Sequence, residues 1–142
     1  MADSVVSTRD YAKHHVSTKK INDHFGEGYH YEVTYTGNNL PVLVQSFYVY
    51  PTKDYVLTDF TLESTSEMAS NYMAPVNVDR MPEVLNQGEN NRALFIPFDN
   101  DCWIRYQSHP LTFTELTSYE VTAIFNNDDR EAMVIGSVEH DS

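Results

Sequence analysis

This 142-residue chain has one cysteine, five glycines and no long apolar run. Cys102 has no partner for an internal disulfide, so the fold depends on its packed core. No apolar run approaches the roughly 20 residues that a membrane-spanning helix needs, and we expect no membrane partner. The length predicts one domain that buries about two-thirds of its unfolded surface.

Basic residues are also scarce, since nine Lys and Arg stand against 21 Asp and Glu, a net charge of −12. This charge repels nucleic acids and anionic membranes. Neutral small molecules, cations, proteins and uncharged polymers remain as partners. The N-terminus lacks the basic and apolar pattern of a secretory leader. Because the sequence stops directly after a strand pattern, at V-E-H-D-S, we expect a piece excised from a longer protein.

Aromatic residues, at 13% of the chain, are typical of a β-protein with well-filled sheet faces. Residues 1–28 are polar and weakly patterned, and we interpret them as an N-terminal arm with one short strand or helical turn. From Tyr29 to Thr36, Tyr and Val alternate with His, Glu and Thr, which predicts a half-buried strand. Residues 42–50 and 55–63 predict two further strands joined as a hairpin.

The second half of the chain continues this pattern. We expect a strand over 68–78 that bends near Pro75, an exposed loop over 79–91, and strands over 92–98 and 102–106. Residues 118–125 and 132–138 flank an N-N-D-D turn and predict a hairpin. About eight short strands without an amphipathic helix predict an all-β fold, an antiparallel β-sandwich over residues 29–142.

The triplet Asp99-Asn100-Asp101, between a strand pattern and Trp103, is the main candidate site. It fits a tight turn between strands, because Asp and Asn accommodate turn geometry. It also fits contact with a carbohydrate, since these side chains hydrogen-bond sugar hydroxyls and Trp103 can stack on a sugar ring. Arg105 shares a strand face with Trp103 and is placed to assist. A calcium site assembled from several loops stays open as well.

Other site types find little support. His14 and His15 are adjacent, so their side chains point to opposite sides of an extended chain, and Cys102 has no His or Cys nearby at metal-binding spacing. Asp101 beside Cys102 would raise the pKa of its thiol, against a role as nucleophile. No Gly-rich phosphate loop and no G-x-S-x-G motif is present. We therefore expect no cofactor and no resident metal.

Three stretches together carry a resemblance to a known family. They are V-L-V-Q-S-F-Y-V-Y with the later D-F-T-L-E-S and S-N-Y-M-A-P-V, then A-L-F-I-P-F-D-N-D-C-W-I-R-Y, and S-Y-E-V-T-A-I-F-N-N-D-D-R-E-A-M-V-I-G-S-V-E-H-D. This set resembles the N-terminal β-sandwich of bacterial α-galactosidase-like glycoside hydrolases of the Bacteroidetes type. The resemblance covers residues 29–142 and implies a supersandwich of the galactose-mutarotase-like kind.

The resemblance implies an accessory domain that packs on a catalytic (β/α)8 barrel of the same parent chain. The barrel holds both catalytic acids, so this chain alone is expected to have no catalytic residue and no turnover. Substrate contact is implied for Asp99, Asn100, Asp101, Trp103 and Arg105, and a domain interface for the run Glu139, His140 and Asp141. The resemblance also implies that the parent protein is periplasmic or secreted. A stand-alone carbohydrate-binding module and a protein-binding sandwich domain remain alternatives.

Overall fold

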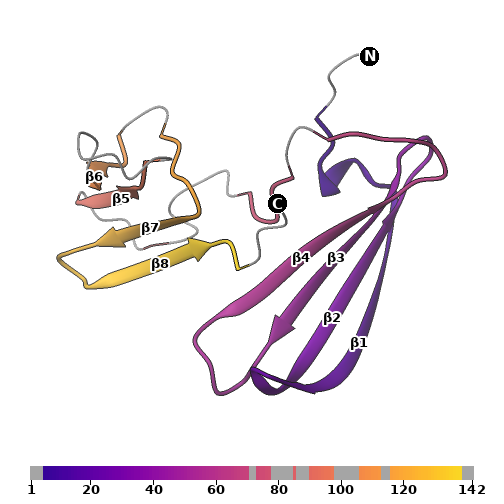
Figure 1. Cartoon of the computed structure of the whole chain (residues 1–142), viewed down its shortest axis with the longest axis horizontal. Coiled ribbons are helices and arrows are strands. Elements are labelled where there is room, and N and C mark those ends of the chain that lie inside the picture. Colours follow the sequence, from indigo (N-terminus) through magenta and orange to yellow (C-terminus); the bar gives the residue numbers. More distant parts are fainter. Residues whose placement is uncertain are drawn as a thin grey trace. The chain divides into compact units, whose positions relative to one another are not determined.

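A computed structural model describes residues 5–70, 73–77, 85, 90–97, 106–112 and 116–138. The described residues form eight strands and one 3-10 turn (Figure 1). All strand pairs are antiparallel, and the strands form two sheets of four. The predicted all-β class is confirmed, and this strand content is consistent with a β-sandwich. The chain divides into two compact units, residues 1–77 and 78–142, where the length predicted one domain.

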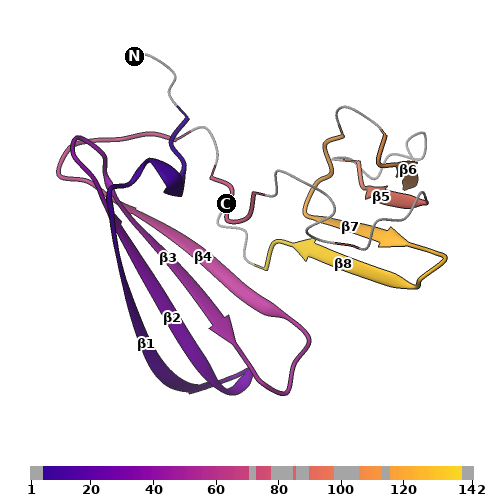
Figure 2. The ribbon, with the colours of Figure 1, turned by 180° about the vertical axis from the view of Figure 1, so that it is seen from behind.

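The first unit is a meander in which each strand pairs with the next (Figures 1 and 2). Its elements are η1 (Thr8–Asp10), β1 (Lys13–Asp23), β2 (Gly26–Thr36), β3 (Val42–Val49) and β4 (Val56–Glu63). The register gives this sheet two different faces, because residues directly opposite each other on paired strands share a face. One face, called the apolar face below, carries Val16, Tyr29, Tyr31, Val33, Tyr35, Leu43, Phe47, Val49, Val56, Phe60 and Leu62.

The opposite, polar face carries mostly charged and hydroxyl side chains, among them Lys19, His30, Glu32, Ser46, Tyr48, Asp59 and Glu63. The predicted alternation over residues 29–36 is confirmed in direction but not in burial. His30 on the polar face is 7% exposed, whereas Tyr31 on the apolar face is 37% exposed. The exposure of these two residues depends on which neighbouring side chains cover them, and the alternation of the sequence alone does not reveal those neighbours.

Segments outside the strands cover part of the apolar face. Tyr11, just after η1, packs its ring 5.8 Å from that of Tyr35, and its hydroxyl donates to the Pro41 carbonyl at 2.9 Å. Farther along the face, Gln45 Nε2 donates to the Pro75 carbonyl at 3.1 Å. Gln45 is buried although it is polar. This hydrogen bond satisfies its amide, which would otherwise be costly to bury.

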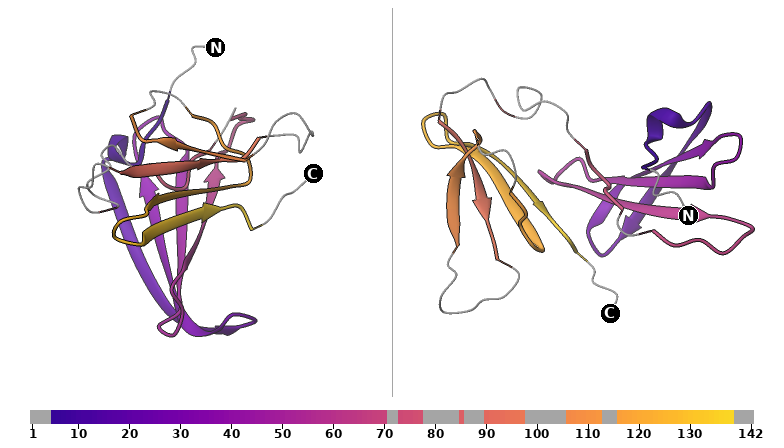
Figure 3. Two further views of the ribbon diagram at one scale, coloured as in Figure 1. Left: turned by 90° about the vertical axis from the view of Figure 1, so that its left-hand side faces the viewer. Right: turned by 90° about the horizontal axis from the view of Figure 1, so that it is seen from above.

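The second unit contains β5 (Asn91–Phe95), β6 (Gln107–Pro110), β7 (Val121–Asn126) and β8 (Glu131–Gly136). Its strand order is β6-β5-β7-β8, as Figure 3 shows. Here apolar residues lie on both faces, most densely on β7 and β8. The register places Ala93, Phe95, Ile124, Met133 and Ile135 on one face and Leu94, Val121, Ala123, Phe125, Ala132 and Val134 on the other.

The predicted hairpins over residues 42–63 and 118–138 are confirmed as β3–β4 and β7–β8. The strand predicted over 92–98 is β5, which is shorter and ends at Phe95. The strand predicted over 102–106 falls almost wholly outside the described residues. Residues 107–110, with no strand predicted, form the short edge strand β6.

Two sequence-based expectations need correction. The segment 1–28 is more than an arm, because β1 pairs with β2 along its whole length and forms an edge of the first sheet. The strand predicted over 68–78 is wrong for its described residues, 68–70 and 73–77, which are not in a strand. In that segment the Pro75 nitrogen cannot donate, and its carbonyl accepts from the Gln45 side chain instead of a neighbouring strand.

Candidate functional site

The side chains predicted to contact a sugar lie outside the described residues. These are Asp99, Asn100, Asp101, Trp103 and Arg105, and Cys102 lies outside them as well. They belong to the segment that connects β5 to β6, two strands that pair directly from Phe95 opposite Gln107 to Arg92 opposite Pro110. The predicted interface residues Glu139, His140 and Asp141 also lie outside, shortly after β8.

The adjacent histidines, His14 and His15, lie among the residues that the structure describes. His14 lies opposite Tyr35 and His15 opposite Thr34, so the two side chains lie on different faces of β1, as expected for neighbours in a strand. Within the described parts of the chain, no three His, Cys, Asp or Glu side chains come together as metal ligands. In the same residues, no helix is long and apolar enough to cross a membrane.

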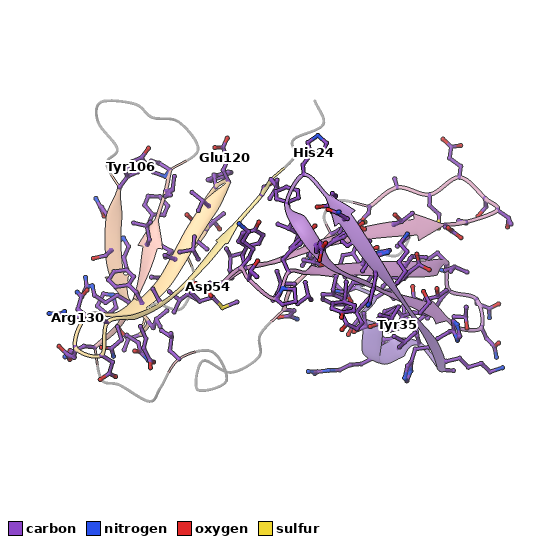
Figure 4. All side chains as sticks on the ribbon, turned by 90° about the horizontal axis from the view of Figure 1, so that it is seen from below. His24, Tyr35, Asp54, Tyr106, Glu120 and Arg130 are labelled. Atoms are coloured by element: carbon purple, nitrogen blue, oxygen red, sulfur yellow. The ribbon has the colours of Figure 1, made fainter. Side chains whose placement is uncertain are left out.

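The most developed cluster lies at the end of the first sheet that contains the β1–β2 turn. Figure 4 labels His24 in that turn and Tyr35 toward the opposite end of β2. The strand-end cluster consists of Asp23, Phe25, Tyr50 and Tyr55. Tyr50 is 2% exposed, and its ring centroid lies 5.8 Å from that of Phe25 and 6.1 Å from that of Tyr55. Phe25 and Tyr55, 43% and 41% exposed, meet edge to face.

Gly28 makes room for this cluster. A Cβ atom on Gly28 would lie 2.6 Å from the Val49 carbonyl oxygen and 2.7 Å from Tyr50 Cδ1. The Tyr50 ring therefore occupies the space above β2 that a side chain would fill. Packing an aromatic ring over a glycine in a neighbouring strand stabilises a sheet where glycine alone would weaken it.

Hydrogen bonds within the strand-end cluster favour a charged Asp23 and a neutral Tyr50. The Tyr50 hydroxyl donates to Asp23 Oδ2 at 2.8 Å, and the Phe25 backbone N–H donates to Asp23 Oδ1 at 2.9 Å. The bond from Tyr50, with help from the backbone N–H groups of Phe25 and Gly26, holds the pKa of the Asp23 carboxyl below its ordinary value. Burial first, and then the bond to Asp23, raises the pKa of Tyr50 to about 12.

A cavity of about 500 Å³ lies at the same end of the sheet and is called the strand-end cavity below. Lys20 is opposite Tyr29 and Asn22 is opposite Glu27, so these two cross-strand pairs build one wall. Pro51 and Thr52, which follow β3 and the clustered Tyr50, contribute another part. The volume lies within the range of about 300 to 1,000 Å³ that is usual for small-molecule sites.

A second cluster lies on the polar face. The His30 ring stacks on that of Tyr48, with centroids 4.6 Å apart and planes 14° apart, and the Tyr48 hydroxyl donates to Asp59 Oδ2 at 2.9 Å. Burial and this bond raise the pKa of Tyr48. His30 Nε2 is buried with no hydrogen-bond partner among the described residues. It therefore activates no serine or cysteine there, as a nucleophile–base pair would require.

The second unit exposes apolar side chains where β7 and β8 run together. Every residue of β8 is exposed, and Val134 is 68% exposed. Val121, Met133, Ile135 and Val138 are exposed as well. Isolated exposed apolar residues are ordinary on protein surfaces, but here they are concentrated on one hairpin, with Val121 and Val134 on one face and Met133 and Ile135 on the other.

Sequence reasoning missed the strand-end cluster, although a signal for it exists. Tyr50 and Tyr55 stand at the two ends of the polar turn P-T-K-D, so a hairpin must bring them together. Comparison with known protein families, with curated proteins and with solved structures found no match for this chain.

Proposed function

We propose that this chain is an accessory β-sheet domain of a glycoside hydrolase of the α-galactosidase-like type. In this proposal the domain packs on a catalytic (β/α)8 barrel of the same parent chain, which is periplasmic or secreted. The barrel supplies the catalytic acids, and this domain contributes stability and part of the rim of the sugar pocket. The proposal starts from the resemblance carried by residues 29–142 and concerns the parent enzyme as a whole.

The observation that carries the proposal is the apolar character of both faces of the β7–β8 hairpin. A sheet that faces water on one side alternates apolar and polar residues, whereas a sheet covered on both sides is apolar throughout. The β7–β8 hairpin has the second pattern, yet every residue of β8 is exposed, and Val134 is 68% exposed. A docked domain accounts for this pattern, because burying one such side chain contributes about 1.5 to 3 kcal/mol.

The predicted interface residues follow β8 closely in the sequence. Glu139, His140 and Asp141 come shortly after β8, so in the proposal they extend the apolar contact with polar groups at its rim. The segment between β5 and β6, which contains Asp99, Asn100 and Asp101, is the part that we propose to reach the sugar pocket. Replacing Asp99 and Asp101 by Ala in the parent enzyme should then raise KM for its glycan.

The docking proposal is tested with separately produced barrel and accessory domains of the parent. Val134→Lys should weaken their association by more than about tenfold, because a lysine cannot leave water for an apolar contact without a large cost. Val16→Lys is the matched control, since Val16 is 52% exposed but lies on β1 in the other sheet. The proposal is wrong if the parent gene encodes no such barrel, or if Val134→Lys binds as well as the control.

A further inference from the structure

We propose that the outer edge of β8 pairs with the same edge of a second copy of this chain, so that two four-stranded sheets join into one. The contact uses backbone groups at the side of the β7–β8 hairpin and no residue of the strand-end cluster or the strand-end cavity. It goes beyond the proposed function, in which the hairpin docks on a barrel through its faces. Because it is tested on this chain alone, its failure leaves the accessory role untouched.

The side of β8 that faces away from β7 has no pairing strand among the described residues. β8 is the last strand of the second sheet, in the order β6-β5-β7-β8 (Figure 1). An edge strand presents a row of unpaired N–H and C=O groups to any strand that approaches it. Natural proteins usually protect such an edge with charged side chains, with proline or by keeping it short.

The other three outer strands of the two described sheets carry this protection. β1 has three lysines, and β4 has Asp59 and Glu63. β6 is only four residues long and contains Pro110. By contrast, β8 has six residues, E-A-M-V-I-G, with one charged side chain at its first position and no proline. Among these four outer strands, β8 is therefore the one that is open to pairing.

Symmetry restricts how two β8 strands can pair. In an antiparallel pair of identical strands the two-fold axis runs through the sheet, so each face continues from one copy into the other. Residues directly opposite each other share a face, whereas neighbours along a strand point to opposite faces. One residue of β8 must therefore lie opposite its own counterpart. Met133 and Val134, in the middle of the strand, are the candidates.

The register centred on Val134 gives every apolar residue of β8 an uncharged partner. It places Val134 opposite Val134, Met133 opposite Ile135, and Ala132 opposite Gly136. Glu131 then lies opposite Ser137, so the carboxylates of the two copies do not meet. Centring on Met133 is less favourable, because it sets Glu131 opposite Ile135. Pairs of β-branched and other apolar residues stabilise neighbouring strands, so we assign the register centred on Val134.

The exposed side chains of β8 fit this contact. Val134 is 68% exposed, and Met133 and Ile135 are each 37% exposed. Side chains directly opposite each other on antiparallel strands have Cβ atoms about 4.5 to 5.5 Å apart, so they cover one another. Val134 meets its partner on one face, and Met133 and Ile135 meet theirs on the other. Pairing therefore removes apolar surface from water on both faces.

The size and charge of the chain limit the strength of this dimer. Two short strands bury less than the roughly 1,200 Å² of a standard protein interface. Each copy also has a net charge of −12, so two copies repel each other at long range. We therefore expect a reversible dimer with a dissociation constant of about 10 μM to 1 mM. Salt screens the repulsion and should strengthen the dimer.

The first test is sedimentation equilibrium of the unaltered chain at concentrations from about 10 μM to 1 mM. The mean mass should rise from 16.3 kDa toward twice that value and stop there, because pairing through β8 uses both free edges and closes. Added NaCl should increase the dimer fraction. Amide hydrogen exchange should slow on β8 as the concentration rises and stay unchanged on β1. These measurements do not depend on whether a variant folds.

Variants at the two-fold axis then test the register. Val134→Lys and Val134→Glu should each weaken the dimer at least about tenfold, because like charges would lie directly opposite each other. An equal mixture of these two variants should form dimers again, since opposite charges then meet. Val16→Lys is the matched control, because Val16 is 52% exposed but lies on β1, and it should dimerise like the unaltered chain.

Four results would overturn the proposal. The first is a monomer at every concentration, and the second is association that continues beyond the dimer. The third is equal weakening by Val16→Lys and Val134→Lys, which would make the effect one of charge anywhere on the chain. The fourth is a mixture of Val134→Lys and Val134→Glu that stays monomeric although both variants keep the dispersed amide spectrum of a folded protein.

Discussion

The hydroxyl of Tyr50 and the carboxylate of Asp23 form a 2.8 Å hydrogen bond that spans a whole strand of the first sheet. Asp23 is the last residue of β1 and Tyr50 follows β3, and these two strands are separated by β2. The bond crosses β2 at Gly28, where no side chain stands in the way. It therefore ties three strands together at the end of the sheet, beyond what the backbone ladder provides.

Replacement of Tyr50 by Phe removes this bond. The free energy of unfolding should then depend less on pH in the alkaline range. The pKa of Tyr50 is about 12 in the folded protein and 10.0 is its ordinary value, so its contribution is complete below pH 10 and disappears as pH rises to about 12. The advantage of the unaltered chain over Tyr50→Phe should shrink across that window. Urea denaturation of both proteins at pH 7, 10 and 12 measures it, and a constant difference at all three values would contradict the prediction.

The carboxyl partner gives the opposite dependence. The pKa of Asp23 is lowered in the folded protein, so its contribution is present above its ordinary value of 3.8 and is lost as pH falls below that value. Asp23→Asn should therefore remove part of the acid-induced loss of stability. Denaturation at pH 7 and pH 3 tests this, and an Asp23→Asn variant that loses as much stability in acid as the unaltered chain would contradict it.

Gly28→Ala should destabilise the first unit by about 1 to 3 kcal/mol, which is usual when extra atoms are forced into a packed site. The new Cβ would meet backbone oxygen at 2.6 Å and the Tyr50 ring at 2.7 Å, so both the ladder and the ring must shift. Gly136→Ala is the control, because its Cβ would meet nothing closer than 3.4 Å. Chemical denaturation should separate the two variants, and equal stability would contradict the prediction.

A negative charge at position 45 should destabilise the protein more than the loss of the Gln45 amide does. Gln45→Leu gives up a hydrogen bond worth about 0.5 to 1.5 kcal/mol and gains apolar contact, so the net change should stay within about 1 kcal/mol. Gln45→Glu places an acceptor against the Pro75 carbonyl on an apolar face and should cost about 2 kcal/mol or more. Limited proteolysis should then cut faster within residues 64–77 in both variants. Equal stability of the two would contradict the prediction.

Asn126 should be the most sensitive polar residue of the second unit. Its Oδ1 accepts from the backbone N–H groups of Asp128 and Asp129, and its Nδ2 donates to Asn91 Oδ1 at 2.8 Å. Because Asn126 is 4% exposed, Asn126→Ala leaves buried groups unpaired and should cost about 1 to 3 kcal/mol. The exposed neighbour serves as control, since Asn127→Ala should stay within about 0.5 kcal/mol. Thermal denaturation would contradict the prediction if both variants melted alike.

The strands predicted from the sequence are those in which apolar and polar residues alternate clearly. Tyr29, Tyr31, Val33 and Tyr35 repeat at every second position, and β2 follows. By contrast, β1 reads K-H-H-V-S-T-K-K-I-N-D and places polar side chains on both faces, so no alternation marks it. An edge strand can have this composition because only one of its sides is paired, and lysines there hinder further pairing. Its pairing with β2 is set by contacts in the folded protein, and the sequence of β1 alone does not predict it.

The candidate site shows the same limit. Nothing local to Asp23 indicates that a tyrosine 27 residues away will donate to it, since this contact depends on the register of three strands and on the missing side chain of Gly28. The misplaced strand over 68–78 has a related cause. The run over 68–78 was expected to be a strand with a bend near Pro75, but the Pro75 carbonyl accepts from the Gln45 side chain of β3 and not from a neighbouring strand.

The two outer strands of the first sheet differ in charge. Three of the nine basic residues, Lys13, Lys19 and Lys20, lie on β1, whereas Asp59 and Glu63 lie on β4. Two copies approaching through the same edge repel each other, so charge opposes a symmetric dimer formed by β1 on β1 or by β4 on β4. Only unlike edges attract, and such head-to-tail pairing is open-ended. Any sheet-to-sheet growth of this protein therefore has a polarity, and salt weakens it.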